Sequence, residues 1–443
     1  MKIKEILKIT NGKLICGDED LDIQNFEKDT RIIQKGDMYV AIKGEKFDGN
    51  DFYKDAINKG AVACLMSKEP EEKIGNVVLV ENTVKAIQQI AAYKRSQVDI
   101  PVVAVTGSVG KTSTKDIVAA VMSQKYKVLK TQGNLNNDIG LPFTLLRLHD
   151  ENAIVVEMGM NHFGEISLLT SIAKPTLAII TNIGTAHIGN LGSRENILKA
   201  KLEILEGLQG NSVIINNDND LLSDWAEKNK EKYNIITYGI NNKNSKYVAE
   251  DIHSYEDRSE YRIDGKEVVV PVGGEHFVLN SLCAIAVGRH FDIPMEKITE
   301  GISGFELTKG RMEIEKVKCG ASIINDTYNA NYDSMKAAIE YLEKIEGKRK
   351  IAVLGDMKEL GEYSESLHRK VGEEVKNIDI LITIGELAKY IEETADVREM
   401  LHFDNNESAL EYLKKIMKKD DIILLKASNS MKFGDIAKEL ILM

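Results

Sequence analysis

The sequence predicts an α/β protein of several domains, with a doubly wound parallel sheet in its central part. Residues 98–310 contain near-continuous apolar runs, which are typical of parallel strands covered by helices on both faces. Helical patterns alternate with these runs, and the same alternation returns in residues 311–443, so a second α/β unit follows the first. Residues 1–97 contain shorter strand-like runs and end in a helical pattern.

The apolar patterns assign the elements in order along the chain. The expected strands are residues 38–42, 62–66, 77–80, 101–106, 153–157, 177–183, 213–216, 322–325, 350–354, 380–384 and 422–426. The expected helices are residues 84–94, 111–124, 195–208, 333–344, 364–376, 407–418 and 432–442. A polar stretch, residues 241–260, predicts an excursion or a hairpin.

The composition indicates a globular protein, because 43% of the 443 residues are hydrophobic and 29% are charged. Domains of roughly 100–200 residues would make two to four of this length. The net charge of −11 argues against a protein that coats nucleic acid or anionic lipid. Charges interrupt the first apolar stretch, and no run approaches the ~18 apolar residues of a membrane span. We therefore expect a soluble protein of the cytoplasm.

The four cysteines lie far apart and form no C-x-x-C pair: Cys16, Cys64, Cys283 and Cys319. This spacing argues against a disulfide scaffold and against a structural zinc site. It fits a reducing compartment.

The strongest chemical signal is the segment TGSVGKTS at residues 106–113, between an apolar strand and a helical pattern. Gly107 and Gly110 allow backbone conformations that aim consecutive N–H groups at phosphate oxygens. The start of the helix adds partial positive charge, Lys111 can reach the terminal phosphates, and the Thr112 hydroxyl can bind Mg²⁺. The alternative is a chance Gly-Lys-Thr on a surface turn. The strand before and the helix after favour nucleotide binding.

Three further side chains follow the loop at positions of possible chemical use. Glu157 ends the strand 153–157, where it could bind Mg²⁺ or cap a neighbouring helix. His187 follows the strand 177–183 and a Gly turn, although a single histidine is more often structural. Lys201 lies in the helix 195–208, and periodicity alone predicts that it is exposed at the surface.

A polar loop bounded by glycines, residues 133–140, contains Asn134, Asn136 and Asn137. Their amides could bind a substrate or complete the hydrogen bonds of a turn, and the turn is the simpler interpretation.

Eight motifs, in order between residues 29 and 430, resemble the Mur ligases, ATP-dependent amide-bond ligases of bacterial cell-wall precursor synthesis. The motifs that resemble the family as a whole are TGSVGKT (106–112), GNLNN (133–137), EMGMNH (157–162) and NIGTAH (182–187). Those that resemble its members joining D-Ala-D-Ala to UDP-N-acetylmuramoyl-tripeptide are DTR (29–31), GEKFDG (44–49), DTYNANYDS (326–334) and LGDMKELG (354–361).

The resemblance implies three domains and a reaction. The domains are residues 1–97 for the UDP end of the substrate, 98–310 for ATP, and 311–443 with a Rossmann-like fold. The implied reaction joins D-Ala-D-Ala to UDP-N-acetylmuramoyl-tripeptide through an acyl phosphate, with ATP and Mg²⁺, in peptidoglycan synthesis. We expect a monomer that binds neither nucleic acid nor membrane.

The resemblance also implies the roles of single residues. The catalytic residues would be Lys111, Glu157, His187 and Lys201, and the metal ligands Thr112, Glu157, His187 and Lys201. Lys201 matches a lysine that carries a carbamate in the family, which reverses the surface prediction. The ATP contacts would be Thr106, Gly107, Ser108, Gly110, Lys111, Thr112, Ser113, Asn280, Arg311 and Asp326. The other substrates would contact Thr30, Arg31, Asn134, Asn136, Asn137, Asn329 and Asn331.

Arg311 and Asp326 would bring the third domain onto ATP, so we expect hinge closure near residues 308–312. The chain departs from the family pattern at Phe277, Tyr332 and Asn429, and a neutral Asn429 cannot replace a bidentate arginine. Two alternatives therefore stay open. One is another Mur-type or folylpolyglutamate-type ligase, and the other is an ATP-binding regulatory module without turnover.

Overall fold

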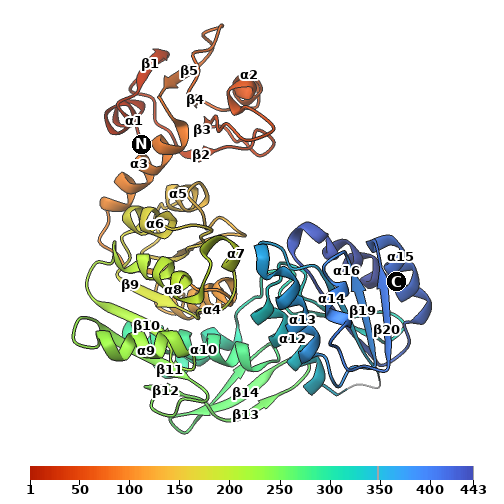
Figure 1. Cartoon of the computed structure of the whole chain (residues 1–443). Coiled ribbons are helices and arrows are strands. Elements are labelled where there is room, and N and C mark those ends of the chain that lie inside the picture. Colours follow the sequence, from red (N-terminus) through yellow and green to blue (C-terminus); the bar gives the residue numbers. More distant parts are fainter. Residues whose placement is uncertain (347–348, 443) are drawn as a thin grey trace.

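A computed structural model describes residues 1–346 and 349–442. Within them, three sheet-based units follow one another along the chain (Figure 1). Figure 1 shows the N-terminal unit at the top, the central unit below it and the C-terminal unit at the right. No helix in the described residues is long and apolar enough to cross a membrane.

The N-terminal unit contains a five-stranded sheet with the order β1-β5-β4-β3-β2. Strands β2 to β5 are parallel, and β1 pairs antiparallel with β5 at the edge. Its elements are α1 Ile3–Thr10, β1 Lys13–Cys16, β2 Asn25–Glu27, β3 Asp37–Val40, η1 Gly49–Phe52, α2 Tyr53–Asn58, β4 Ala63–Met66, β5 Asn76–Leu79 and α3 Thr83–Ser96. The buried runs of β3 and β4 form the middle of this sheet.

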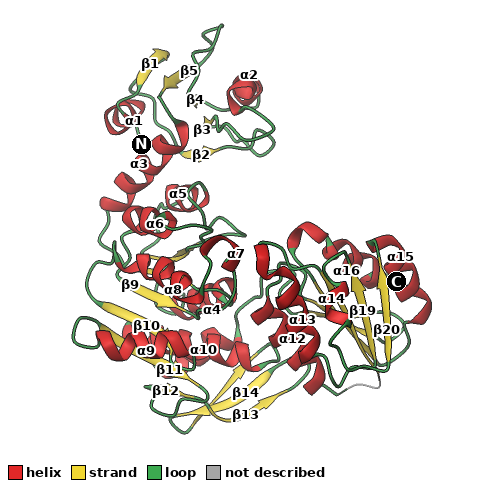
Figure 2. Ribbon diagram, viewed as in Figure 1, coloured by secondary structure: helices red, strands yellow, loops and turns green. Residues whose placement is uncertain are grey.

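The central unit contains a seven-stranded parallel sheet with the order β12-β11-β10-β9-β6-β8-β7 (Figure 2). Its strands are β6 Val102–Thr106, β7 Val128–Lys130, β8 Ala153–Glu157, β9 Leu177–Ile180, β10 Ser212–Asn216, β11 Asn234–Gly239 and β12 Tyr247–Val248. Strands β6 and β8 are buried throughout, as their apolar runs predict.

The helices of the central unit are α4 Lys111–Met122, α5 Gly140–Leu146, α6 Glu165–Ala173, α7 Ile188–Leu191, α8 Arg194–Leu202, η2 Glu203–Leu205, α9 Asp220–Asn229, α10 Glu275–His290 and α11 Met295–Ser303. A small antiparallel sheet precedes α10, formed by β13 Glu250–Ser254, β14 Ser259–Ile263 and β15 Lys266–Val270. The hairpin predicted at residues 241–260 is confirmed in its second half, where β13 and the start of β14 pair antiparallel, whereas residues 247–248 form β12 of the seven-stranded sheet.

The C-terminal unit contains a six-stranded sheet with the order β16-β17-β21-β18-β19-β20, in which only β16 is antiparallel. Its strands are β16 Glu313–Lys316, β17 Ser322–Asn325, β18 Arg349–Gly355, β19 Ile380–Ile384, β20 Glu399–Phe403 and β21 Asp421–Lys426. Its helices are α12 Tyr332–Lys344, η3 Gly361–Tyr363, α13 Ser364–Glu374, α14 Lys389–Glu392, α15 Asn406–Ile416, η4 Asn429–Met431 and α16 Phe433–Ile441.

The predicted α/β class with mostly parallel sheets is confirmed. Several predicted elements end early, and two of them fall short by three residues or more. The strand expected at 177–183 stops at Ile180, since the following residues bind the phosphate loop. The helix expected at 195–208 stops at Leu202 and continues as the short η2 turn.

Candidate functional site

The loop between β6 and α4 has a shape that only glycine permits at Gly107. Its φ is +155°, and a Cβ atom there would lie 1.8 Å from Oγ1 of Thr181. Gly110 has a φ of +79° and directly precedes α4, so no side chain caps this helix. The first N–H groups of α4 are therefore left for an anionic ligand.

Residues after β9 hold this loop in place from the neighbouring strand. Oδ1 of Asn182 accepts hydrogen bonds from the N–H groups of Ser108, at 3.0 Å, and Val109, at 2.9 Å. Thr181 Oγ1 donates to the Val109 carbonyl at 2.6 Å. Because β6 and β9 are adjacent in the sheet, these hydrogen bonds fix the position of the loop relative to the end of β9.

A buried carboxylate lies beside the first turn of α4. Oε2 of Glu157 accepts a 2.9 Å hydrogen bond from the Thr112 hydroxyl, and Oε1 accepts a 2.7 Å bond from Nδ2 of Asn136. Glu157 is 2% exposed. The predicted Thr112, Glu157 and Asn136 are thus in contact, on three separate segments of the chain.

Lys111 folds back over the loop. Its Nζ donates to the carbonyls of Gly107, at 2.8 Å, and Ser108, at 3.3 Å. Burial lowers the pKa of Lys111, an effect that the charge of Glu157 opposes. A cation held by neutral carbonyls next to open helix N–H groups is suited to a phosphate group.

The surface prediction for Lys201 is wrong, because the side chain is 1% exposed. It makes no hydrogen bond or ion pair with any residue that the structure describes. Burial, aided by the charge of Lys111, lowers its pKa well below the ordinary value. The periodicity failed here because the pattern within α8 does not reveal the nearby charge of Lys111.

His187 has a φ of +64° and lies directly before α7. Its Nδ1 atom is 3.1 Å from Oε2 of Glu359, which belongs to the C-terminal unit. Burial lowers the pKa of His187, so the ring is neutral at pH 7.

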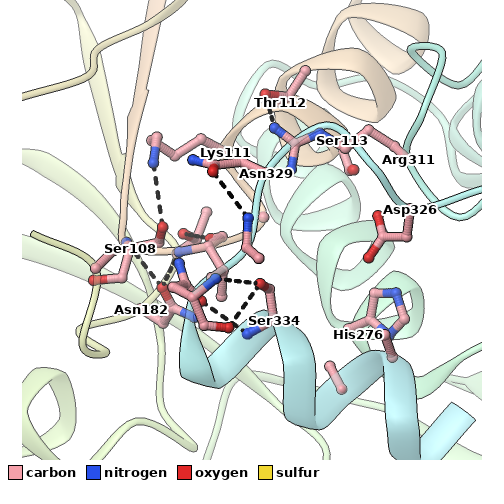
Figure 3. A pocket seen from close by; sticks show the side chains of 18 of the residues that line it. Ser108, Lys111, Thr112, Ser113, Asn182, His276, Arg311, Asp326, Asn329 and Ser334 are labelled. Carbon is pink, nitrogen blue, oxygen red and sulfur yellow. Dashed lines mark hydrogen bonds between the residues drawn. The ribbon is translucent and has the colours of Figure 1, made fainter. Parts of the chain in front are cut away.

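A cavity of about 450 Å³ opens between the central and C-terminal units, and it is lined by the phosphate loop, Asn280, Arg311, Asp326 and Asn329. Figure 3 shows Arg311 beside Thr112, and Asp326 beside His276 further along the cavity. All the predicted ATP residues except Thr106 and Gly107 line it.

The C-terminal wall of the cavity holds two cations, the half-buried Arg311 and the buried Lys426. Nη2 of Arg311 lies 3.3 Å from Oγ1 of Thr112, and its guanidinium stacks on the Tyr328 ring at 3.9 Å. Nζ of Lys426 donates to Oδ2 of Asp326 at 2.5 Å. Arg311 therefore brings positive charge to the phosphate loop from the C-terminal unit, whereas the charge of Lys426 is paired with Asp326.

Several predicted substrate residues have partners within the protein. Arg31 is exposed and pairs with Asp29 at 2.6 Å. Oδ1 of Asn137 accepts from the Gly140 N–H, as the turn interpretation predicts, and Asn331 caps α12. The structure leaves Thr30, Arg31 and Asn134 away from the cavity, while Asn329 and Asn331 line it.

Residue patterns missed Asn182 and Glu359 as site residues, although both lie within quoted motifs. Asn182 follows a strand adjacent to the one that carries the phosphate loop, and this position was the available signal. Glu359 has a φ of +66° after β18, and nothing in its local pattern predicts contact with His187.

The donor set near the loop suits Mg²⁺. The described residues contain no group of three or more His, Cys, Asp or Glu side chains able to hold a metal by themselves. Thr112 and Glu157 nevertheless offer a hydroxyl and a carboxylate next to a phosphate site. Mg²⁺ is typically held by one or two carboxylates together with substrate phosphates, so this partial set fits the ion.

Family models match the chain in three successive segments. They are described as "Mur ligase family, catalytic domain" over residues 22–110, "Mur ligase middle domain" over 105–288, and "Mur ligase, glutamate ligase domain" over 310–429.

Similar proteins match along the whole length. The UDP-N-acetylmuramoyl-tripeptide--D-alanyl-D-alanine ligase of Bacillus subtilis (strain 168) is 39% identical, over 99% of this chain and 98% of its own. The ligase of the same name from Escherichia coli (strain K12) is 35% identical over 99% and 98%. The crystal structure of MurF from Acinetobacter baumannii superposes with a TM-score of 0.89 at 29% identity, covering 100% and 99%. That of MurF ligase from Thermotoga maritima in complex with ADP gives 0.84 at 29%, covering 96% and 99%.

Proposed function

The chain belongs to the Mur ligase family, and on this premise we propose that it joins D-Ala-D-Ala to UDP-N-acetylmuramoyl-tripeptide, using ATP, in peptidoglycan precursor synthesis. The observation that carries the proposal is the cavity where the phosphate loop faces Arg311 of the C-terminal unit. A nucleotide can be held there from two sides, next to a buried carboxylate.

The reaction needs activation because a carboxylate and an amine do not condense at neutral pH, hydroxide being a poor leaving group. Transfer of the γ-phosphoryl group to the tripeptide carboxylate replaces hydroxide with phosphate. The D-Ala-D-Ala amine then attacks the acyl phosphate carbonyl, and the tetrahedral intermediate expels phosphate. One C–N bond forms, one C–O bond breaks, and the amine loses a proton.

The role of the protein is to bring two anions together. Two unit charges ~4 Å apart repel by about 4 kcal/mol at an effective dielectric constant of 20. Lys111 and Arg311 offset this repulsion from opposite sides of the cavity. Phosphoryl transfer depends mainly on such positioning and charge stabilisation.

Thr112 and Glu157 would bind Mg²⁺, and His187 and Lys201 would be its further ligands. When bound, Mg²⁺ neutralises phosphate charge during transfer. Lys201 would supply an anion after carbamylation, because the neutral amine that burial favours is the form that reacts with CO₂.

The remaining substrate assignments extend the same proposal. We assign residues 1–97 to the UDP end of the substrate, 98–310 to ATP and 311–443 to closure of the site. Thr30, Arg31, Asn134, Asn136, Asn137, Asn329 and Asn331 would contact the substrates, and Asn280 the adenine. The enzyme would act as a monomer in the cytoplasm.

The acyl phosphate must be protected from water, so the C-terminal unit would close further over ATP by rotation near residues 308–312. Small-angle scattering with and without an ATP analogue plus the UDP substrate tests this closure. Identical scattering curves would contradict it.

Phosphate release from ATP, measured with UDP-N-acetylmuramoyl-tripeptide and a panel of amines, tests the function itself. We expect release only with D-Ala-D-Ala. Release with a single amino acid or with glutamate would favour another Mur-type or folylpolyglutamate-type ligase. ATP binding without release under any condition would favour a regulatory module.

A further inference from the structure

The linker between α11 and β16, residues 304–312, contacts the central unit by apolar and polar groups. Phe305 is buried in the apolar core, and Leu307 packs against it. The hydroxyl of Thr308 donates a 2.7 Å hydrogen bond to Oδ2 of Asp116, in the middle of α4. Asp116 is 3% exposed, and its Oδ1 lies 2.7 Å from Nζ of Lys115 and 2.8 Å from Nζ of Lys130. The carboxylate is thus neutralised by lysines of the central unit, and the linker supplies a separate donor.

From Gly310 onwards, the linker belongs to the C-terminal unit. The Gly310 carbonyl accepts from the Tyr328 N–H at 3.1 Å, and the Met312 N–H donates to Oδ1 of Asp326 at 3.3 Å. Lys309, between the two attachments, is exposed. The junction between the two bodies is therefore as short as one residue.

Arg311 then reaches back to the helix that holds Thr308. Its Nη2 atom contacts Oγ1 of Thr112, four residues before Asp116 in α4. Residues four apart lie on the same face of a helix, about 6 Å apart along its axis. The linker therefore runs along one face of α4 towards the phosphate loop, fixed at both ends of that path.

We propose that Asp116 and Thr308 are positioning residues: their hydrogen bond fixes the start of the linker to α4, so that Arg311 meets the Thr112 hydroxyl at the phosphate loop. The inference rests on the proposed function, since Arg311 matters when phosphate charge must be stabilised there. Without the bond, Phe305 and Leu307 still pack in the core, but the one polar contact left between the described linker residues and α4 is the long 3.3 Å contact of Arg311.

The test replaces Thr308 without leaving a buried charge unpaired, because Asp116 keeps both lysines. Thr308→Val removes the hydroxyl at nearly constant volume, and Thr308→Ser restores it. Thr299→Val is the matched control, since its hydroxyl bonds within α11 to the Glu296 carbonyl.

We expect Thr308→Val to lower kcat for phosphate release about tenfold, the effect of losing one hydrogen bond to a charged group. The dissociation constant of ADP and the unfolding temperature stay near those of the wild type, and Thr308→Ser recovers most of kcat. An unchanged kcat would overturn the proposal. So would equal losses of kcat, ADP affinity and stability, which would show a merely structural role.

A second readout does not depend on turnover. A dye pair on the exposed Cys319 and on Lys228→Cys, in a Cys16→Ser background, reports the distance between the two units. Thr308→Val is expected to broaden the distance distribution, and an unchanged distribution overturns the proposal. If the wild type releases no phosphate with the expected substrates, the proposed function fails, whereas the distance measurement still decides the role of Thr308.

Discussion

The two joints between the units are built differently. At the first, α3 packs its apolar residues, Ala86, Ile87, Ile90 and Ala91, into the core that it shares with the central unit. Arg95 is 7% exposed and donates to the carbonyls of Ala173, at 2.9 Å, and Lys174, at 3.1 Å, at the C-terminal end of α6. This joint is a continuous buried contact.

The second joint surrounds a cavity and adds polar contacts to an apolar core, since the same core continues into the C-terminal unit through Met335, Ala338 and Ile339. Asp333 accepts from the Thr185 N–H at 2.7 Å and from its hydroxyl at 2.9 Å. The Tyr363 hydroxyl donates to the Gly192 carbonyl at 2.8 Å. Polar contacts exchange readily with water, whereas buried apolar contacts do not. We therefore expect the first joint to be the more rigid one and the second, where the chemistry is proposed, to be the one that moves.

The largest expected effect concerns the phosphate loop, on the central side of the second joint. Lys111→Ala is expected to lower ligation by about a thousandfold or more, because a buried cation at the proposed phosphate site is lost. The fold is retained, as circular dichroism would show. Activity within about tenfold of the wild type would contradict the phosphate-loop assignment.

Lys201→Ala is expected to lower ligation about a hundredfold, because the carbamate proposed at this buried position cannot form. Short-chain carboxylic acids are expected to restore part of the activity by replacing the missing anion. Lys199→Ala, two residues away in α8, is the control. Full activity of Lys201→Ala without any acid would remove the carbamate from the mechanism.

At the first joint, Arg95→Met is expected to lower the free energy of unfolding by about 3 kcal/mol, since buried carbonyls lose their donor. The kcat of the folded fraction stays unchanged, because this joint does not move in the reaction. Arg262→Met, at an exposed position of β14, is the control for the loss of charge. A large fall in kcat with unchanged stability would show that the first joint also takes part in closure.

At the second joint, Gly189→Ala tests whether activity requires the close approach of the central and C-terminal units. A Cβ atom at Gly189 would lie 2.6 Å from the backbone nitrogen of Gly361, in the C-terminal unit. Backbone cannot move aside as a flexible side chain can, so we expect kcat to fall about tenfold, with ADP affinity kept. Gly434→Ala is the control, because its Cβ would meet the nearest atom at an ordinary 3.5 Å. Wild-type kcat for Gly189→Ala would show that the units need not approach this closely.

The sequence predicted the parallel strands and the phosphate loop because these depend on local apolar runs and on glycine spacing. It missed α10, whose residues are apolar nearly all round and show no helical face. It also placed Lys201 at the surface, because the pattern of its own helix shows neither its burial nor the nearby charge of Lys111. The departures at Tyr332 and Asn429 have local partners, Glu374 and the Tyr328 carbonyl, which no pattern reveals.

The smallest expected effect is a pH dependence of the free energy of unfolding that arises at the second joint. His276 lies at the second joint, where burial lowers its pKa to about 4, against the pull of the Asp326 charge. Between pH 6.5 and about 4, the unfolded chain binds a proton at His276 that the folded protein does not. The free energy of unfolding therefore falls as the pH falls, by about 1 kcal/mol from pH 7 to pH 5.5. His276→Gln is expected to flatten this part of the stability profile, measured by urea unfolding, while His253→Gln, exposed on β13, leaves it unchanged. An equally steep profile in His276→Gln would show that proton binding by His276 on unfolding does not cause this loss of stability.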